Sequence, residues 1–222
     1  MKKIGFVIFV VALTIGLIFT PNCSFGNFTG IKGSGTSKIQ QRNVSGFKRV
    51  DAGGALNVEV DAQKDFSVTV EADDNLLEHI KTEVNGDTLK IYSEGKISPT
   101  AKLNVKISMP EIQGLNLSGA SDGKITNVRT DSLELKASGA SEVVIVGEAK
   151  TLEADASGAS TIDAENLDVE DANVEASGAS KAMVSATNNL EADASGASKI
   201  SYTGEPKNIK QNSSGASSIN KK

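Results

Sequence analysis

Ser118-Gly119-Ala120-Ser121 is the first of six identical tetrapeptides that decide the fold of this chain. The six copies begin at Ser118, Ser138, Ser157, Ser177, Ser195 and Ser214. Successive copies are 20, 19, 20, 18 and 19 residues apart. Self-similarity at a nearly fixed period indicates a repeat architecture, in which every copy marks the same point of one structural unit.

The residues around each tetrapeptide alternate between apolar and polar. If the first serine of a copy is position 0, positions −1, −3 and −5 are mostly apolar, and so are positions +5 and +7. Position −2 is always polar: Asn116, Lys136, Asp155, Glu175, Asp193 and Asn212. Alternation with period 2 is typical of a strand with one buried face. Each unit should therefore contain a strand, a corner of small residues, a second strand and a polar turn.

A unit of this length cannot bury its apolar face alone, so copies must stack. Stacking in parallel places equivalent residues above one another and builds a continuous core. The sequence thus predicts an all-β fold, a β-solenoid with 18–20 residues per coil. A right-handed parallel β-helix is expected because crossovers between parallel strands are nearly always right-handed. Ile162 and Val184 should point inward, and Asp163 and Glu175 outward.

The tetrapeptides are interpreted as structural corners. Glycine reaches backbone angles that a tight corner needs, and serine can bond to nearby backbone or to a serine in the next coil. A catalytic serine would need a base, and the single histidine, His79, lies in a different region. Six equivalent serines therefore predict a ladder and no catalytic residue. The predicted corner residues are Ser118, Gly119, Ser138, Gly139, Ser157, Gly158, Ser177, Gly178, Ser195, Gly196, Ser214 and Gly215.

Residues 1–26 are predicted to be a signal peptide, because Lys2 and Lys3 precede an uncharged apolar run at 4–19. Cleavage after Gly26 is one interpretation. The other is a lipoprotein signal ending before Cys23, although residues 20–22 match the usual lipobox poorly. An uncleaved anchor is disfavoured because the run is shorter than the roughly 20 residues of a spanning helix. Membrane attachment is thus expected only through a lipid on Cys23.

The remaining chain divides into three parts. Residues 27–42, rich in glycine, serine and threonine, are predicted to be a flexible linker. Residues 43–110 should form an irregular β-rich cap with one helical segment at 73–80 and a hairpin at Asn85-Gly86. Within this part, Gly53-Gly54-Ala55 looks like a degenerate first copy of the corner. Residues 111–222 are the repeat solenoid.

Composition excludes several classes of function. Cys23 is the only cysteine, so neither an intramolecular disulfide nor a thiolate metal site can form. The formal net charge is −5, with no basic stripe, which argues against a nucleic-acid partner. Positions −2 and −4 carry many acidic residues. Their face could bind cations or a polar polymer, or could be the solvated side of a sheet.

Several stretches together resemble the bacterial head GIN domain family. They are Gly-Phe-Lys-Arg-Val at 46–50, Gly-Gly-Ala-Leu-Asn-Val at 53–58, residues 70–77, residues 87–91 and the six tetrapeptides. The resemblance covers roughly residues 43–220. It implies an exported autotransporter-type adhesin head, often a lipoprotein, with a solenoid-like β fold. The family brings no catalytic residues to transfer.

Three functions follow as hypotheses. The first is an exported, non-catalytic adhesin at the surface or outer membrane of a bacterium, binding an unknown surface glycan or protein and open to self-association. The second is a structural protein of the periplasm or envelope. The least favoured is an enzyme acting on polysaccharide, because its carboxylates should converge and these are spread periodically. No cofactor or metal is expected, although Asp163, Asp168, Glu170 and Asp171 share one turn and could bind calcium.

Overall fold

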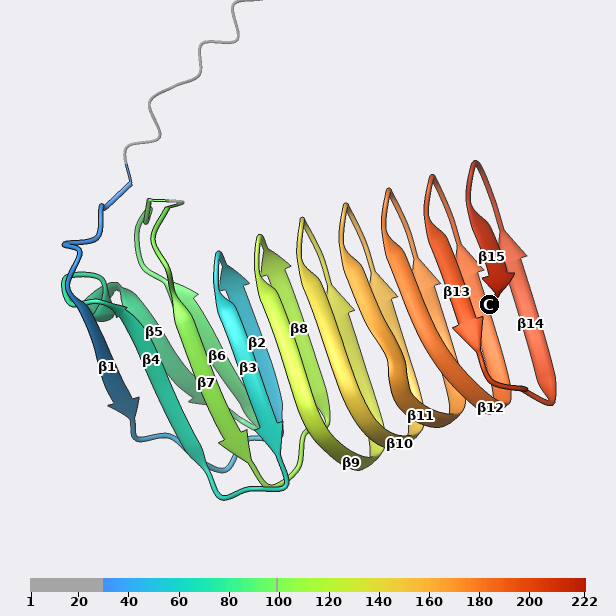
Figure 1. Ribbon diagram of the computed structural model, residues 1–222, viewed down its shortest axis with the longest axis horizontal. Coiled ribbons are helices and arrows are strands. Elements are labelled where there is room, and N and C mark those ends of the chain that lie inside the picture. Colours follow the sequence, from blue (N-terminus) through green and yellow to red (C-terminus); the bar gives the residue numbers. More distant parts are fainter. Residues whose placement is uncertain (1–29, 99) are drawn as a thin grey trace, which may run out of the picture.

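The computed structural model describes residues 30–98 and 100–222, which wind into a flattened β-solenoid (Figure 1). The predicted signal peptide with Cys23 lies outside the described residues. Two layers of strands are joined by tight corners along one edge and by wider bends along the other (Figure 1). Within the described part of the chain, no helix is long and apolar enough to cross a membrane.

Fifteen strands and one short 3-10 helix are found in the described residues. The first part contains β1 (Ser37–Arg42), β2 (Arg49–Gly54), β3 (Asn57–Ala62), β4 (Ser67–Asp73), the 3-10 helix η1 (Leu77–His79), β5 (Ile80–Asn85), β6 (Thr88–Ser93) and β7 (Asn104–Met109). The repeat part contains β8 (Gly114–Gly119), β9 (Asp122–Ala137), β10 (Glu142–Ala156), β11 (Thr161–Ala176), β12 (Lys181–Ala194), β13 (Lys199–Thr203), β14 (Asn208–Ser213) and β15 (Ser218–Lys221).

Each of the long strands β9 to β12 contributes to both layers. Its first half lies in one layer, which we call sheet A, with β3, β7, β13 and β15. Its second half lies in the other layer, sheet B, with β2, β6, β8 and β14. The wide bend is thus a bent stretch of strand with register shifts, such as the one between Val144 and Val146, where a separate turn was predicted.

The coils stack in parallel and in register, which confirms the predicted β-solenoid. Ala137, Ala156 and Ala176 lie above one another in three successive coils. The predicted inward residues Ile162 and Val184 are fully buried, whereas Asp163 and Glu175 face outward. Burial of a side chain such as Ile162 contributes about 1.5–3 kcal/mol, so the repeated apolar columns hold the two sheets together.

The first coil of the chain, formed by β2 and β3, lies in space between coils formed by later residues. Strand β2 lies between β6 and β8, and β3 lies between β7 and β9. The corner between β2 and β3 stacks on the first tetrapeptide, with Gly54 opposite Gly119. This register confirms that Gly53-Gly54-Ala55 is a degenerate copy of the corner.

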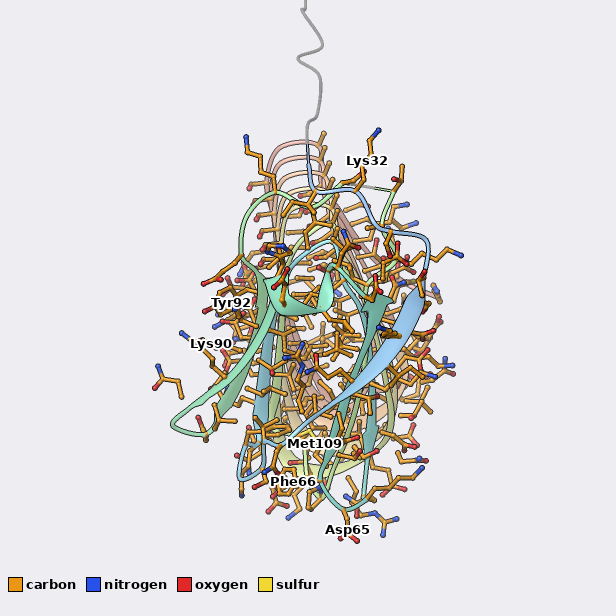
Figure 2. The ribbon with its side chains drawn as sticks, turned by 90° about the vertical axis from the view of Figure 1, so that its left-hand side faces the viewer. Lys32, Asp65, Phe66, Lys90, Tyr92 and Met109 are labelled. Atoms are coloured by element: carbon orange, nitrogen blue, oxygen red, sulfur yellow. The ribbon has the colours of Figure 1, made fainter. Side chains whose placement is uncertain are left out.

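Antiparallel strands finish the end of the solenoid that faces the reader in Figure 2. Strand β4 pairs with β7 and β1 pairs with β4, while β5 and β6 form the hairpin predicted at Asn85-Gly86. The helical segment predicted at 73–80 is reduced to η1. In the end view, Lys90 and Tyr92 project outward from β6, and the interior between the sheets is filled with side chains (Figure 2).

The prediction of a flexible linker over residues 27–42 is wrong for Ser37–Arg42, which forms β1. The preceding residues are also tied down: the Ser34 hydroxyl donates to Asp74 Oδ1 at 2.5 Å, and the Asn75 amide donates to the Lys32 carbonyl oxygen at 2.8 Å. The side chains of β1 are almost all exposed, so its sequence shows no apolar alternation. Backbone hydrogen bonds to β4 hold this strand in place, and its polar composition gives no signal of a strand in the sequence.

Candidate functional site

The six tetrapeptides form one continuous row of corners between the sheets. Gly119, Gly139, Gly158, Gly178, Gly196 and Gly215 have φ between +74° and +82°, the left-handed region that favours glycine. They also approach one another closely. The Ala140 amide donates to the Gly119 carbonyl oxygen at 2.7 Å, and a Cβ on Gly139 would lie 2.5 Å from that oxygen. Only glycine satisfies both conditions.

The fourth serine is buried in five of the six tetrapeptides, and in most copies its hydroxyl hydrogen-bonds to the preceding coil. Ser180 Oγ donates to the Ala156 carbonyl oxygen of the preceding coil at 2.9 Å. Ser160 and Ser198 make the same bond to Ala137 and Ala176. These hydroxyls therefore bond to backbone, which was one of the two predicted arrangements, and not to each other.

The first serines, Ser118, Ser138, Ser157, Ser177, Ser195 and Ser214, are more exposed than the fourth. The backbone N–H of Ser177 donates to the Ala156 carbonyl oxygen at 2.9 Å, so this oxygen accepts two bonds from the next coil. His79, the one candidate base, lies in η1 at the far end of the molecule from β14 and β15. The backbone of the first serines and the hydroxyls of the fourth thus connect successive coils.

The two serines of one tetrapeptide should differ in their contribution to stability. Ser180→Ala removes a buried hydrogen-bond donor and is expected to lower the free energy of unfolding by about 0.5–1.5 kcal/mol. Ser177→Ala removes a hydroxyl that makes no hydrogen bond among the described residues, and should change it by less than about 0.5 kcal/mol. Urea denaturation of both variants measures the difference, and equal midpoints would refute this role of the fourth serine.

The outer surface of sheet B is acidic. Its outward positions −6, −4 and −2 in five coils carry seven carboxylates and two lysines, a net charge of −5. We call this surface the acidic face. It consists of Ser132, Glu134, Lys136, Thr151, Glu153, Asp155, Asp171, Asn173, Glu175, Asn189, Glu191, Asp193, Asn208, Lys210 and Asn212.

The outer surface of sheet A has balanced charge. Positions +4, +6 and +8 of its six coils carry four carboxylates and four lysines. The charged residues of this neutral face are Asp122, Lys124, Glu142, Asp163, Glu165, Lys181, Lys199 and Lys222. Some of them pair across coils: Lys222 Nζ lies 2.9 Å from a Glu165 carboxylate oxygen. Over the repeat coils β9 to β15, the outer surfaces of the two sheets therefore differ in net charge.

Ion pairs neutralise the two ends of the acidic face. Arg49 on β2 crosses Gly114 on β8 to reach Glu134 on β9, and Lys136 contacts the same carboxylate. The hydrogen bond from Lys136 and then that from Arg49 lower the pKa of Glu134. A Cβ on Gly114 would lie 2.9 Å from Arg49 Nη1, so glycine leaves room for the guanidinium.

At the opposite end, Lys210 pairs with Glu191, and this hydrogen bond raises the pKa of Lys210.

The middle coils carry an excess of negative charge, although Lys136 lies opposite Asp155 at one edge of this group. Asp155, Glu175 and Asp193 are direct neighbours in three successive coils, about 4.8 Å apart at ordinary strand spacing. Among the described residues, neither Asp155 nor Glu175 forms an ion pair, and Glu153 forms none either. Like charges opposite one another are destabilising, so a cationic partner would relieve repulsion at these positions.

A shallow groove of about 510 Å³ runs along the acidic face across five coils. One wall is a row of hydroxyl, amide and carboxylate groups at position −6, in which Asn208 donates to Asn189 at 2.9 Å and Asn189 donates to Asp171 at 2.5 Å. The other wall contains Glu153 and Glu191 at position −4. Between these columns lie the position −5 residues Leu152, Ala172, Leu190 and Ile209, so the groove combines an apolar floor with polar and mostly acidic walls for a linear ligand lying along the axis.

The calcium alternative gains no support from the geometry. In the described residues, no three His, Cys, Asp or Glu side chains are placed to hold a metal ion. The Asp171 carboxylate accepts hydrogen bonds from Asn188 and Asn189, whereas Asp168 and Glu170 are exposed along the wide bend.

Sequence reasoning identified the outward columns −2 and −4 and missed the row at position −6. Its signal was present, because Ser132, Thr151, Asp171, Asn189 and Asn208 occupy the same offset in every coil. Hydrogen bonding between their amides and carboxylates depends on the stacking, which only the structure shows.

The corners, the stacked cores and the two flat faces define a compact parallel β-solenoid of the kind that presents extended surfaces. The chain belongs to the family described as "Putative auto-transporter adhesin, head GIN domain", whose match covers residues 46–206, more than half of the chain. The resemblance inferred from the sequence is thereby confirmed.

Solved structures share this fold. A "putative adhesin" from Bacteroides fragilis superposes with a TM-score of 0.73 at 22% identity, covering 87% of this chain and 100% of the other. A "putative adhesin" from Parabacteroides distasonis has a TM-score of 0.56 at 21% identity, covering 87% and 100%. A "putative lipid binding protein" from the same species has a TM-score of 0.52 at 22% identity, covering 86% and 99%. Among curated proteins, no sequence matches the chain.

Proposed function

We propose that this protein is an exported, non-catalytic adhesin whose acidic face binds a surface polymer, glycan or protein, that carries amino groups. The observation behind the proposal is the charge difference between the two sheets over the repeat coils, −5 on the acidic face against zero on the neutral face. Family membership supports an adhesive role, and the predicted signal peptide supports export.

The geometry suits a ligand held by many weak contacts. Carboxylates recur at strand spacing in the −2 column beside the groove, so a chain of cationic groups can meet several of them at once. Each exposed ion pair contributes only about 0.2–1 kcal/mol, and affinity would come from their number. Such binding weakens as salt increases, because exposed charges are screened over about 8 Å at physiological ionic strength.

Paired charge reversals test the proposed binding face. Asp155→Lys, Glu175→Lys and Asp193→Lys together invert the centre of the acidic face. Asp122→Lys, Glu142→Lys and Asp163→Lys together change the net charge equally on the neutral face. We expect the first triple to reduce binding to amine-bearing polymers such as polylysine and chitosan at least tenfold, and the second to reduce it less than threefold.

Equal losses in the two triples would show that only total charge matters and would refute the assigned face. No binding by the unmodified chain would refute the proposed ligand class.

Protease treatment of intact cells, with a lysed control, tests the location. Digestion of the repeat region in intact cells is expected for an adhesin at the surface. Protection until lysis would contradict it and favour a structural role in the envelope.

A further inference from the structure

Strands β14 and β15 form the last described coil, and its chemistry differs from that of the repeat coils before it. Strand β14 pairs only with β12, and β15 pairs only with β13, among the described strands. Among the described residues, each of these two strands is therefore paired along one edge only. Exposed strand edges are templates for pairing with another chain.

Polar residues replace apolar ones at three of the five inward columns of this coil, while Ile209 at −5 and Ile219 at +5 stay apolar. Position −3 holds Leu135, Ala154, Val174 and Ala192 in the preceding coils, all buried, and then Gln211. Position −1 holds four buried alanines and then Ser213. Position +7 holds Ile145, Ala164, Val184 and Tyr202 and then Lys221. The changes occur at once in three columns that are otherwise apolar.

The substituted side chains cover the coil below. Lys221 lies opposite Tyr202, and its ammonium group donates to Glu205 at 2.7 Å, so its aliphatic stem can shield the apolar surface while the charge stays in water. A further coil stacked on this one would bury Gln211 and the Lys221 ammonium group, and burial of unpaired polar or charged groups is unfavourable. Lys210 and Lys221 also place positive charge on both edges, a common protection of edge strands.

We propose that residues 208–222 form a polar cap that prevents a second molecule from stacking end-on onto the solenoid. The other end is finished differently, by the antiparallel strands β1, β4 and β5. The self-association that the sequence left open is therefore not expected through β14 and β15.

Restoring the repeat chemistry should remove the cap. The triple variant Gln211→Val, Ser213→Ala and Lys221→Val introduces the residues that preceding coils carry at the same positions, as Val174, Ala194 and Val184 show. We expect the unmodified full-length chain to be monomeric and the triple variant to form dimers, doubling the mass in light scattering. Growth should stop at the dimer, because the antiparallel end remains closed and two equivalent ends form a closed pair.

A matched control places the same residue types on outward positions of the same strands. Asn208→Val, Asn212→Ala and Asn220→Val should leave the chain monomeric. Thermal melting checks that both triples fold. If the cap triple does not fold, Lys221→Val alone tests the same point and should dimerise at concentrations at which the unmodified chain remains monomeric. The proposal is overturned if the folded cap variant stays monomeric, if the control dimerises equally, or if the unmodified chain already pairs through β14.

Discussion

Gly139→Ala is expected to lower the melting temperature of the solenoid by about 10 °C, far more than Gly35→Ala. Both glycines have φ near +80°, so both variants incur the roughly 1–2 kcal/mol of a left-handed alanine. The two glycines differ in the space available to an added Cβ atom. A Cβ on Gly139 would lie 2.5 Å from the Gly119 carbonyl oxygen, whereas nothing lies within 4 Å of a Cβ on Gly35. Forced separation of the coils adds about 1–3 kcal/mol, as for other overpacked sites.

Thermal denaturation followed by circular dichroism compares the two variants. For a chain of this length, 1 kcal/mol corresponds to about 2–4 °C, so Gly35→Ala should shift the midpoint by only a few degrees. If the two midpoints fall together, the close approach of the corners makes no separate contribution, and backbone angle alone explains the repeated glycine.

Ile162→Asp should destabilise the chain by more than about 3 kcal/mol, whereas its neighbour Asp163→Lys should change stability by less than about 1 kcal/mol. Ile162 is fully buried between the sheets, and Asp163 faces outward on the next position of the same strand. The first change removes apolar burial and introduces a carboxyl group with no partner in the core. The second exchanges one partly exposed charge for another.

Urea denaturation of the two variants measures this contrast, and a Glu175→Lys variant extends it to sheet B, where the residue is also outward. Similar midpoints for Ile162→Asp and Asp163→Lys would contradict the inward and outward assignment of β11.

The repeat part could be predicted because local and long-range signals coincide there. Ala156 is both an alternating residue within its strand and the partner of Ala137 and Ala176, so one sequence column fixes both facts. Strand β1 could not be predicted, because its pairing uses backbone groups that every residue has. The position of β2 between β6 and β8 could not be predicted either, because strand order is set by contacts between segments far apart in the chain.

The candidate site was likewise predictable only in part. The acidity of the columns that contain Asp155 and Glu153 is visible in the sequence, but the neutrality of the opposite side emerges only when the columns are assigned to two sheets. Neutralisation of Glu134 by Arg49 could not be foreseen either, since 85 residues separate the two and the contact passes over Gly114.

The equivalence of the coils gives the molecule a way to change its reach in evolution. Each coil contacts mainly its two neighbours, so unequal recombination within the gene could add or delete one copy without disturbing the corners of the others. Every added copy would lengthen the acidic face by about 4.8 Å. The number of binding positions for a polymeric ligand would then be set by the number of repeats. It could vary between strains while the chemistry of each coil stayed the same.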